Sequence, residues 1–290
     1  MTLEQLRIFI AVAEQQHMTQ AAQALNLTQS ATSAAIAALE ERHDIRLFDR
    51  IGRRIELTEL GRAFLPEARA VVARAQEAAG LLSASAGLLR GHLDLAASQT
   101  AANYWLPPLM YKFRQAYPGI ALKLRIMNTR DACQAVVEGT ADLGFVEDQI
   151  EVPTLARHRA TRDQMVLIAA PHLSGVATDP AKAQWVMREK GSGTRAILEH
   201  ALQAADIKPA SIVLELPSNE AVRAAVEAGA GISALSRLVV EPSLANGRLI
   251  ALPHNLPARE FFAINSLQRH VSRAADAFLR HVLAQHTPEM

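Results

Sequence analysis

The sequence predicts an α/β protein in three parts: a small helical domain that ends in a hairpin, one long helix, and two α/β lobes. Three observations support this prediction. Residues 1–60 hold short segments with helical apolar spacing and one alternating hairpin. Residues 61–90 are rich in alanine and contain few helix breakers. From residue 91 onward, apolar strand-like runs alternate with helical segments, which is typical of a parallel sheet with crossover helices.

Three short helices are expected in the first part. The segment LEQLRIFIAVAEQ (3–15) places its apolar residues at helical spacing. Thr19 is expected to cap a second helix, residues 20–27, and Thr28 a third, because a threonine hydroxyl accepts the early N–H groups of a helix. A hairpin then turns at Gly52.

The long helix, residues 61–90, carries one narrow apolar stripe along its length. Pro66 is expected in its first turn, where proline is tolerated. A narrow stripe favours pairing with a second helix, so we expect a linker that joins two copies of the chain. A helix buried in the core of one chain is the alternative.

The remaining residues predict two similar lobes, and the last helix, about 270–285, is expected to return to the first of them. The expected strands are 92–98, 120–127, 141–146, 164–171, 183–189, 211–216 and 231–236. The expected helices between them are 104–118, 131–139, 194–205 and 219–229. The predicted boundaries are therefore 1–60 for the helical domain, 61–90 for the linker, 91–161 with 267–290 for lobe I, and 162–266 for lobe II.

Composition narrows the class of protein. A chain of 290 residues is long enough for about two domains, and half of it is hydrophobic. The formal net charge of +1 argues neither for nor against nucleic acid. The single cysteine, Cys133, cannot form a disulfide within the chain, which favours a reducing compartment. Its side chain is expected to be a small buried hydrophobic group and not a nucleophile. The N-terminus has no signal-peptide pattern, and no apolar run suits a membrane helix, so a cytoplasmic protein without a membrane partner is expected.

The third expected helix has an unusual surface. In NLTQSATSAAIAALE (26–40) no charge occurs between Thr28 and Leu39, and nearly all side chains are small. Such a helix can lie deep in the major groove of DNA, as the second helix of a helix-turn-helix does. Candidate groups that read bases lie in its first two turns: Gln29, Ser30, Thr32 and Ser33. Glutamine can pair with adenine and a threonine methyl can contact thymine, whereas Ile36 and Leu39 are expected to face inward.

Positive charge is concentrated in the following hairpin. Arg46, Arg50, Arg53 and Arg54 face a single acid there, Asp49. A basic hairpin beside a neutral reading helix is typical of a wing, and arginines neutralise phosphates. We therefore predict phosphate contacts from Arg50, Arg53 and Arg54, in a winged helix-turn-helix.

The segment MTQAAQALNLTQSATSAAIAALEERHDIRLFDRIGRRIELTELGRAF closely resembles the N-terminal signature of LysR-type transcriptional regulators. The resemblance implies a winged helix-turn-helix, a dimerising linker helix and a periplasmic-binding-protein-like effector domain, assembled as a homodimer or homotetramer. It also implies double-stranded operator DNA, a small-molecule effector and RNA polymerase as partners. Ala34 and Ala35 depart from the long polar side chains of many relatives, which leaves more recognition to DNA shape.

A ligand of such a two-lobed domain is expected in the cleft, at strand ends and helix N-termini. Three stretches carry suitable groups: Ser98 and Thr100, Asn128 and Thr129, and Gly191, Ser192, Gly193 and Thr194. Residues 191–194 precede a helix, and we call them the oxyanion cradle, since glycines let backbone amides converge on an anion. Ser218 and Asn219 form a weaker fourth stretch. ANYWLPPLMYKFRQAYP and GSGTR resemble regulators of carbon fixation and sulfur assimilation, so the expected effector is sulfite, sulfate, phosphate or a phosphorylated metabolite.

An enzyme and a solute-binding protein are the two alternative classes of protein. An enzyme is disfavoured because GSGT fits neither a nucleophile elbow nor a phosphate loop, and no catalytic residues are predicted. The ten histidines are scattered without zinc spacing, so no metal and no cofactor is expected. The alternative function is a two-lobed solute-binding or sensor protein without a direct role on DNA.

Overall fold

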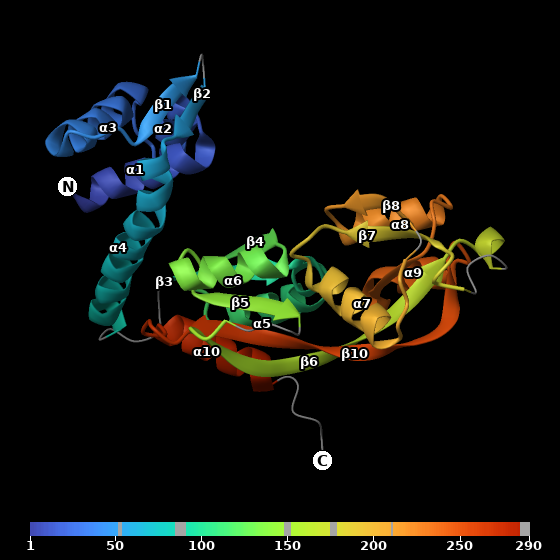
Figure 1. Ribbon diagram of the computed structural model, residues 1–290. Helices are drawn as coiled ribbons and strands as arrows, with labels where there is room; N and C mark the ends of the chain where they lie inside the picture. The colour runs from blue at the N-terminus through green and yellow to red at the C-terminus, as the bar shows by residue number, and fades with distance from the viewer. Residues whose placement is uncertain (52–53, 85–90, 148–151, 175–178, 210, 285–290) are drawn as a thin grey trace. The chain divides into compact units, whose positions relative to one another are not determined.

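The computed structural model describes residues 1–51, 54–84, 91–147, 152–174, 179–209 and 211–284 (Figure 1). The chain divides into two compact units, Met1–Ser85 with Glu138–Thr140, and Ala86–Val137 with Ala141–Met290. Within the described ranges, no helix has both the length and the apolar character that crossing a membrane requires.

The N-terminal unit contains three helices, a hairpin and a long helix. Its elements are α1 (Leu3–Gln15), α2 (Met18–Ala24), α3 (Gln29–His43), β1 (Phe48–Ile51), β2 (Arg54–Leu57) and α4 (Glu59–Ala84). The cap at Thr28 is confirmed, because its hydroxyl accepts the N–H of Ala31 at 3.2 Å. The cap at Thr19 is wrong. Helix α2 begins at Met18, whose side chain is buried in the core, and Thr19 lies inside the first turn.

One hydrophobic cluster holds α1, α2, α3, the hairpin and the first half of α4 together. The ring of Phe9 lies 5.3 Å from that of Phe48 and 5.2 Å from that of Phe64, measured between centroids. Helix α4 begins two residues earlier than expected, so Pro66 lies inside it and not in its first turn. Gly61 lets α4 approach the backbone, since a Cβ there would lie 2.2 Å from the carbonyl oxygen of Leu47.

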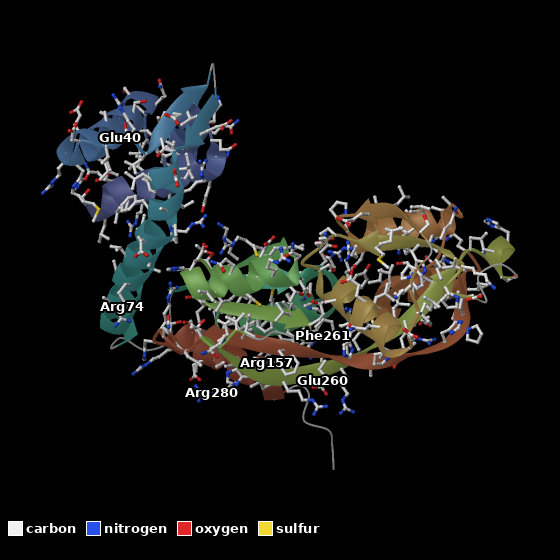
Figure 2. The ribbon with its side chains drawn as sticks, in the orientation of Figure 1. Glu40, Arg74, Arg157, Glu260, Phe261 and Arg280 are labelled. Atoms are coloured by element: carbon white, nitrogen blue, oxygen red, sulfur yellow. The ribbon has the colours of Figure 1, made fainter. Side chains whose placement is uncertain are left out.

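A buried carboxylate fixes the hairpin to α3. The Glu40 side chain is 8% exposed, and its Oε1 accepts the N–H groups of Leu47 at 2.7 Å and Phe48 at 3.2 Å (Figure 2). Its Oε2 lies 3.3 Å from Nη1 of Arg46. These bonds set where β1 leaves α3, because a buried carboxylate keeps its charge only with such donors.

The C-terminal unit is built on a mixed sheet with the strand order β4-β3-β5-β10-β6-β9. In its first half, β3 (Gly91–Ser98), β4 (Ile120–Met127) and β5 (Leu143–Glu147) are parallel, as expected. They are connected by η1 (Ala101–Trp105), a π-helical turn, with α5 (Leu106–Ala116), and by α6 (Thr129–Glu138). The final helix, α10 (Arg273–Ala284), packs into the same cluster as β3 and α5 through Phe278.

The second half repeats this pattern around the parallel strands β7 (Gln184–Arg188) and β8 (Ser211–Leu216). Its other elements are η2 (Pro171–Leu173), α7 (Gly193–Ala204), α8 (Asn219–Glu227), β9 (Ser233–Ser236) and α9 (Arg237–Ala245). Strand β7 bridges to Ile232 on its other side. Helix α9 was not expected from the sequence.

Two long antiparallel strands run through both halves: β6 (Leu155–Ala169) and β10 (Ile250–Ser266) (Figure 1). The sequence prediction is wrong here, since it placed a strand only at 164–171 and none at 250–266. Pro253 and Pro257 account for the missed β10, because proline interrupts a ladder and the pairing does shift register between Ala251 and Ala258.

We predict that Glu40→Ala destabilises the N-terminal unit by about 1–3 kcal/mol, because two buried N–H groups lose their acceptor. Thermal unfolding of the full chain measures this. The matched control is Glu41→Ala, the neighbouring exposed carboxylate, which should stay within about 0.5 kcal/mol of wild type. Equal effects of the two substitutions would contradict the role of Glu40.

The pKa values also predict an inert thiol. Cys133 lies in the cluster beneath α6, and burial raises the pKa of its thiol to about 11. At pH 8 only about one thiol in a thousand is therefore ionised. We expect iodoacetamide to label native protein far more slowly than urea-unfolded protein at this pH, with labelling of native protein accelerating as the pH approaches 11. Rapid native labelling at pH 8 would contradict the burial.

Candidate functional site

The first three turns of helix α3 present an uncharged, nearly smooth outer face. Gln29 and Ser30 are exposed near its start, Ser33 is partly exposed, and the other exposed positions up to Leu39 carry only methyl groups, at Ala31, Ala34, Ala37 and Ala38. The inward prediction for Ile36 and Leu39 is confirmed, since they are 5% and 1% exposed. Nothing longer than glutamine stands between the first half of this helix and a partner surface.

The structure corrects one of the four predicted reading residues. Thr32 is fully buried, and its hydroxyl donates to the carbonyl oxygen of Thr28 at 3.1 Å. Its methyl group therefore packs within the unit and cannot reach a base. Ser33 remains partly exposed, and its Oγ accepts from Nε2 of Gln29 at 3.4 Å, which links two of the remaining three candidates.

The hairpin carries two of the predicted arginines, Arg50 on β1 and Arg54 on β2. Its register pairs Arg50 with Ile55 and Ile51 with Arg54. Arg53 lies outside the described residues, and only the backbone of Arg50 and Arg54 is described. All three arginines follow Glu40 in the sequence, in the segment that comes directly after α3.

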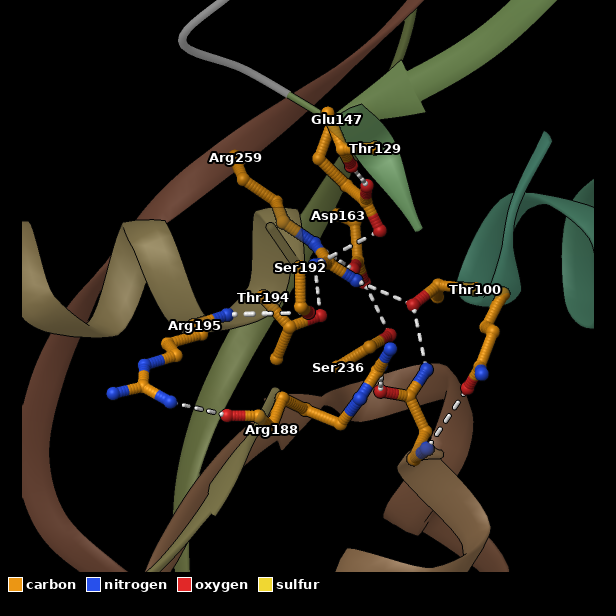
Figure 3. A network of polar contacts seen from close by, with 12 residues as sticks. Thr100, Thr129, Glu147, Asp163, Arg188, Ser192, Thr194, Arg195, Ser236 and Arg259 are labelled. Carbon is orange, nitrogen blue, oxygen red and sulfur yellow. Dashed lines mark hydrogen bonds and ion pairs between the residues drawn. The ribbon is translucent and has the colours of Figure 1, made fainter. Parts of the chain in front are cut away.

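In the C-terminal unit, a buried guanidinium forms the centre of the polar network drawn in Figure 3. Arg259, on β10, is 1% exposed, and its Nε donates to Oδ2 of Asp163 at 2.6 Å. Its Nη1 donates to Oγ1 of Thr194 at 3.0 Å and its Nη2 to Oγ1 of Thr100 at 3.1 Å. The ring of Phe261 lies 5.2 Å away. Arg259 thus contacts residues that arise far apart in the sequence.

Two carboxylates balance this cation. The Asp163 side chain is 2% exposed and accepts a second bond, from the hydroxyl of Ser236 at 3.0 Å. Glu147, also 2% exposed, lies 3.4 Å from Nη1 of Arg259 through Oε1 and accepts the hydroxyl of Thr129 at 2.6 Å through Oε2. A buried charge persists only with such partners.

The structure brings four of the eight predicted effector residues together: Thr100, Thr129, Gly193 and Thr194. The backbone of Gly193 lies close to the side chain of Thr129, since a Cβ on Gly193 would be 2.6 Å from Oγ1 of Thr129. Ser98 is 3% exposed at the end of β3, and its hydroxyl has no hydrogen-bond partner among the described residues.

The other three predicted residues act locally. Asn128 caps α6, accepting the N–H of Asp131 at 2.9 Å, and Ser192 caps α7. Gly191 has φ +95°, a conformation that favours glycine, and its carbonyl accepts the N–H of Arg130 at 3.2 Å. The last bond nevertheless ties the oxyanion cradle to α6.

Further bonds join the two halves beside the hydroxyls. Asn219 is 1% exposed, donates to Oγ1 of Thr100 at 3.0 Å and accepts from Nη1 of Arg188. Its N–H bonds Oε1 of Gln99 at 3.0 Å. Tyr104 donates to Glu220 at 3.2 Å, and burial, with the nearby carboxylate, raises the pKa of this phenol so that it keeps its proton at neutral pH. The halves are therefore held closely together around the network.

Sequence reasoning missed the charged members of this network. Glu147 directly ends the apolar run LGFV, and an acid at the end of a buried strand was a usable signal. Asn219 was given too little weight as a helix cap. Arg259 and Asp163 gave no such signal, because each lies among other charged residues, in PAREF and TRDQ.

Comparisons with known families identify both parts of the chain. Residues 3–62 match the family "Bacterial regulatory helix-turn-helix protein, lysR family", and residues 86–287 match "LysR substrate binding domain". The second match alone covers more than half of the chain. Proteins of this family are transcriptional regulators, which excludes the enzyme alternative.

Relatives that align with most of the chain place it within a subgroup. A regulator of Escherichia coli K12, named YeiE, is 36% identical over 286 residues, 96% of each chain. The RuBisCO operon transcriptional regulator of Allochromatium vinosum is 32% identical and covers 98% of this chain and 96% of its own. The regulator CysL of Bacillus subtilis is 33% identical over 86% of this chain and 85% of its own. The expected similarity to carbon-fixation and sulfur-assimilation regulators is thereby confirmed.

Solved structures agree in fold. Full-length CbnR in complex with its target DNA has a TM-score of 0.68 at 23% identity and covers 97% of this chain and 99% of its own. The regulatory domain of CcmR from Synechocystis PCC6803, in complex with 2-PG, has a TM-score of 0.61 at 29% identity over 69% of this chain and 99% of its own. The predicted fold class is confirmed, and this chain belongs to the LysR family of bacterial helix-turn-helix transcriptional regulators.

Proposed function

We propose that this regulator reads its operator through the start of α3 and responds to a small anionic effector held between its two lobes. The uncharged, exposed face of α3 is the observation that supports the DNA role most directly. A helix without charge or bulk can approach base edges closely, and the neighbouring hairpin supplies the cations. A solute-binding protein without a role on DNA would have no use for such a face.

Gln29, Ser30 and Ser33 are the proposed base-reading residues, with Arg50, Arg53 and Arg54 on phosphates. Since the rest of the face is alanine, much of the specificity falls to the shape and deformability of the operator. Thr32 keeps a structural part, holding the first turn of α3 to its cap.

We assign functional boundaries that follow the sequence prediction: residues 1–60 read DNA and 61–90 link two copies. Lobe I comprises 91–161 with 267–290, and lobe II 162–266. The hydrophobic clusters support this division for the helices, because α10 packs with β3 and α5, while α7 packs with β7 and β9. In the second half of β10, by contrast, Phe261 and Ala263 pack with β3 and α5 of lobe I.

The effector site is proposed at Ser98, Thr100, Asn128, Thr129, Gly191, Ser192, Gly193 and Thr194. The buried hydroxyl of Ser98 lacks a partner among the described residues, which suits a site that a ligand completes. Sulfite, sulfate, phosphate and phosphorylated metabolites fit the hydroxyls and the N-terminus of α7. The related CcmR regulatory domain in complex with 2-PG supports a small-molecule ligand in this part of the chain.

Self-association is supported by an exposed apolar edge. On strand β8, Ile212, Val213 and Leu214 are 47%, 37% and 40% exposed. An unpaired apolar edge of this kind can pair with another chain. A depression of about 290 Å³ beside it is lined by Met187, Leu202 and Ile207 among others.

The proposal also includes the assembly and its partners: a homodimer or homotetramer in the cytoplasm that acts with RNA polymerase. An effector that favours one lobe arrangement by ~1–3 kcal/mol is enough to change how the DNA is held.

The test is a titration of the purified full chain with the DNA immediately upstream of its own gene and with scrambled DNA, at several salt concentrations. Binding to the first that is stronger by ~10³-fold or more supports a sequence-specific regulator. Equal binding to both DNAs at every salt concentration, with and without sulfite, sulfate and phosphate, would overturn it.

A pair of substitutions separates reading from phosphate binding. Ser33→Arg places a bulky cation on the smooth face and should abolish the preference for operator over scrambled DNA. Arg53→Ala should weaken both DNAs about equally and reduce the salt slope by about 1. The measurement is the same titration, and wild-type behaviour in both variants would contradict the docking of α3.

A further inference from the structure

The place that the sequence predicts for an effector anion already holds an anion of the protein itself. The carboxylate of Glu147 lies against the first residue of α7, since a Cβ on Gly193 would be only 2.7 Å from its Oε2. The hydroxyl of Thr129 donates to the same oxygen at 2.6 Å. The start of a helix and a hydroxyl are the groups expected of an oxyanion site, and here a carboxylate lies against the first and accepts a hydrogen bond from the second.

The buried charged side chains of the network already carry more negative than positive charge. Arg259 contributes one positive charge, and Glu147 with Asp163 contribute two negative ones, all on side chains that are 2% exposed or less. The nearby cation Arg188 is neutralised by Glu189, with Nε to Oε2 at 2.7 Å. An effector anion added to this group would bring a third negative charge into a buried place, whereas an anion that replaces Glu147 leaves the charge unchanged.

The distances indicate which contact can exchange. Asp163 holds Nε of Arg259 at 2.6 Å and is itself held by Ser236, so the guanidinium is anchored on that side. The contact of Nη1 with Glu147 is 3.4 Å, the longest that Arg259 makes in this network. Its two terminal nitrogens also face the hydroxyls of Thr194 and Thr100, so an oxyanion placed among them would meet an edge of two donors.

We propose that Glu147 is a resident anion of the effector site, and that an anionic effector takes its place on Arg259, Thr129 and the oxyanion cradle. Glu147 then sets the affinity threshold for the effector, and Arg259 is the residue that selects an anion. The inference rests on the effector site proposed above. Because Glu147 ends β5 while Gly193 begins α7, its release also removes a contact between the lobes.

The test compares full-length wild type, Glu147→Gln and the control Glu241→Gln by calorimetric titration with sodium sulfate, sodium sulfite and sodium phosphate. Glu241 makes the same chemical change at an exposed carboxylate on α9. We expect at least one of the three anions to bind Glu147→Gln about tenfold or more tightly than wild type or the control, since a like charge has been removed. Equal or weaker binding of all three by Glu147→Gln would overturn the inference.

The two levels of the argument fail separately. Operator binding without anions is measured on the same preparations. If wild type distinguishes its operator but Glu147→Gln gains no affinity for any anion, the resident-anion inference fails alone. If wild type does not distinguish its operator under any condition, the proposed function fails.

A crystal structure of wild type in saturating sulfate covers the case in which Glu147→Gln does not fold. Sulfate bonded to Arg259 and Thr129, with the Glu147 carboxylate turned away, supports the exchange. Glu147 still bonded to both residues, whether or not sulfate is bound elsewhere, overturns it.

Discussion

The C-terminal unit depends on one constraint, the neutralisation of a guanidinium that is almost entirely removed from water. Arg259 costs several kcal/mol to bury unless acids meet it. The sheet supplies them by register: Arg259 is the cross-strand partner of Asp163, and Glu147 is the partner of Phe261, two residues further along β10. A slip of β10 by one residue would turn Arg259 to the opposite face and leave two acids unpaired. The charges therefore specify how the three central strands align.

The same cation couples the lobes. Its terminal nitrogens reach Thr100, after β3, and Thr194, in α7, which belong to different halves of the unit. Asn219 then joins Thr100 to Arg188, so a chain of bonds runs from one half to the other through a single threonine. Because each half binds one terminal nitrogen of Arg259, any change in what Arg259 binds alters contacts in both halves. A site placed here controls lobe arrangement more directly than a site within either hydrophobic core.

The sequence predicts those parts whose signal is local. The cap at Thr28, the inward Ile36 and Leu39, and the parallel β3, β4 and β5 all follow from spacing within one segment. Its failures have a common cause, which is that the deciding partner lies elsewhere. Thr32 was predicted as an exposed reading residue, but the packing of α3 within its unit buries it completely. The charged first half of β6 gives no strand signal by itself, and its Arg159 and Arg162 find their partner in Glu260 of β10, which is labelled in Figure 2. The strand-end hydroxyls predicted from the sequence, Thr100 and Thr129, do lie in one polar network, but its central cation, Arg259, gave no local signal.

The two buried carboxylates, Glu40 and Glu147, differ in the kind of donor that holds them. Glu40 is held by the backbone N–H groups of Leu47 and Phe48, close along the chain, and these donors cannot move without unfolding the hairpin. Glu147 is held by side chains, a hydroxyl on α6 and a guanidinium on β10, together with the start of α7. Side chains can change rotamer and accept another anion while the backbone stays in place. The hairpin is thus fixed to α3 by backbone donors that stay in place, whereas the side-chain contacts of Glu147 permit the exchange of anions proposed above.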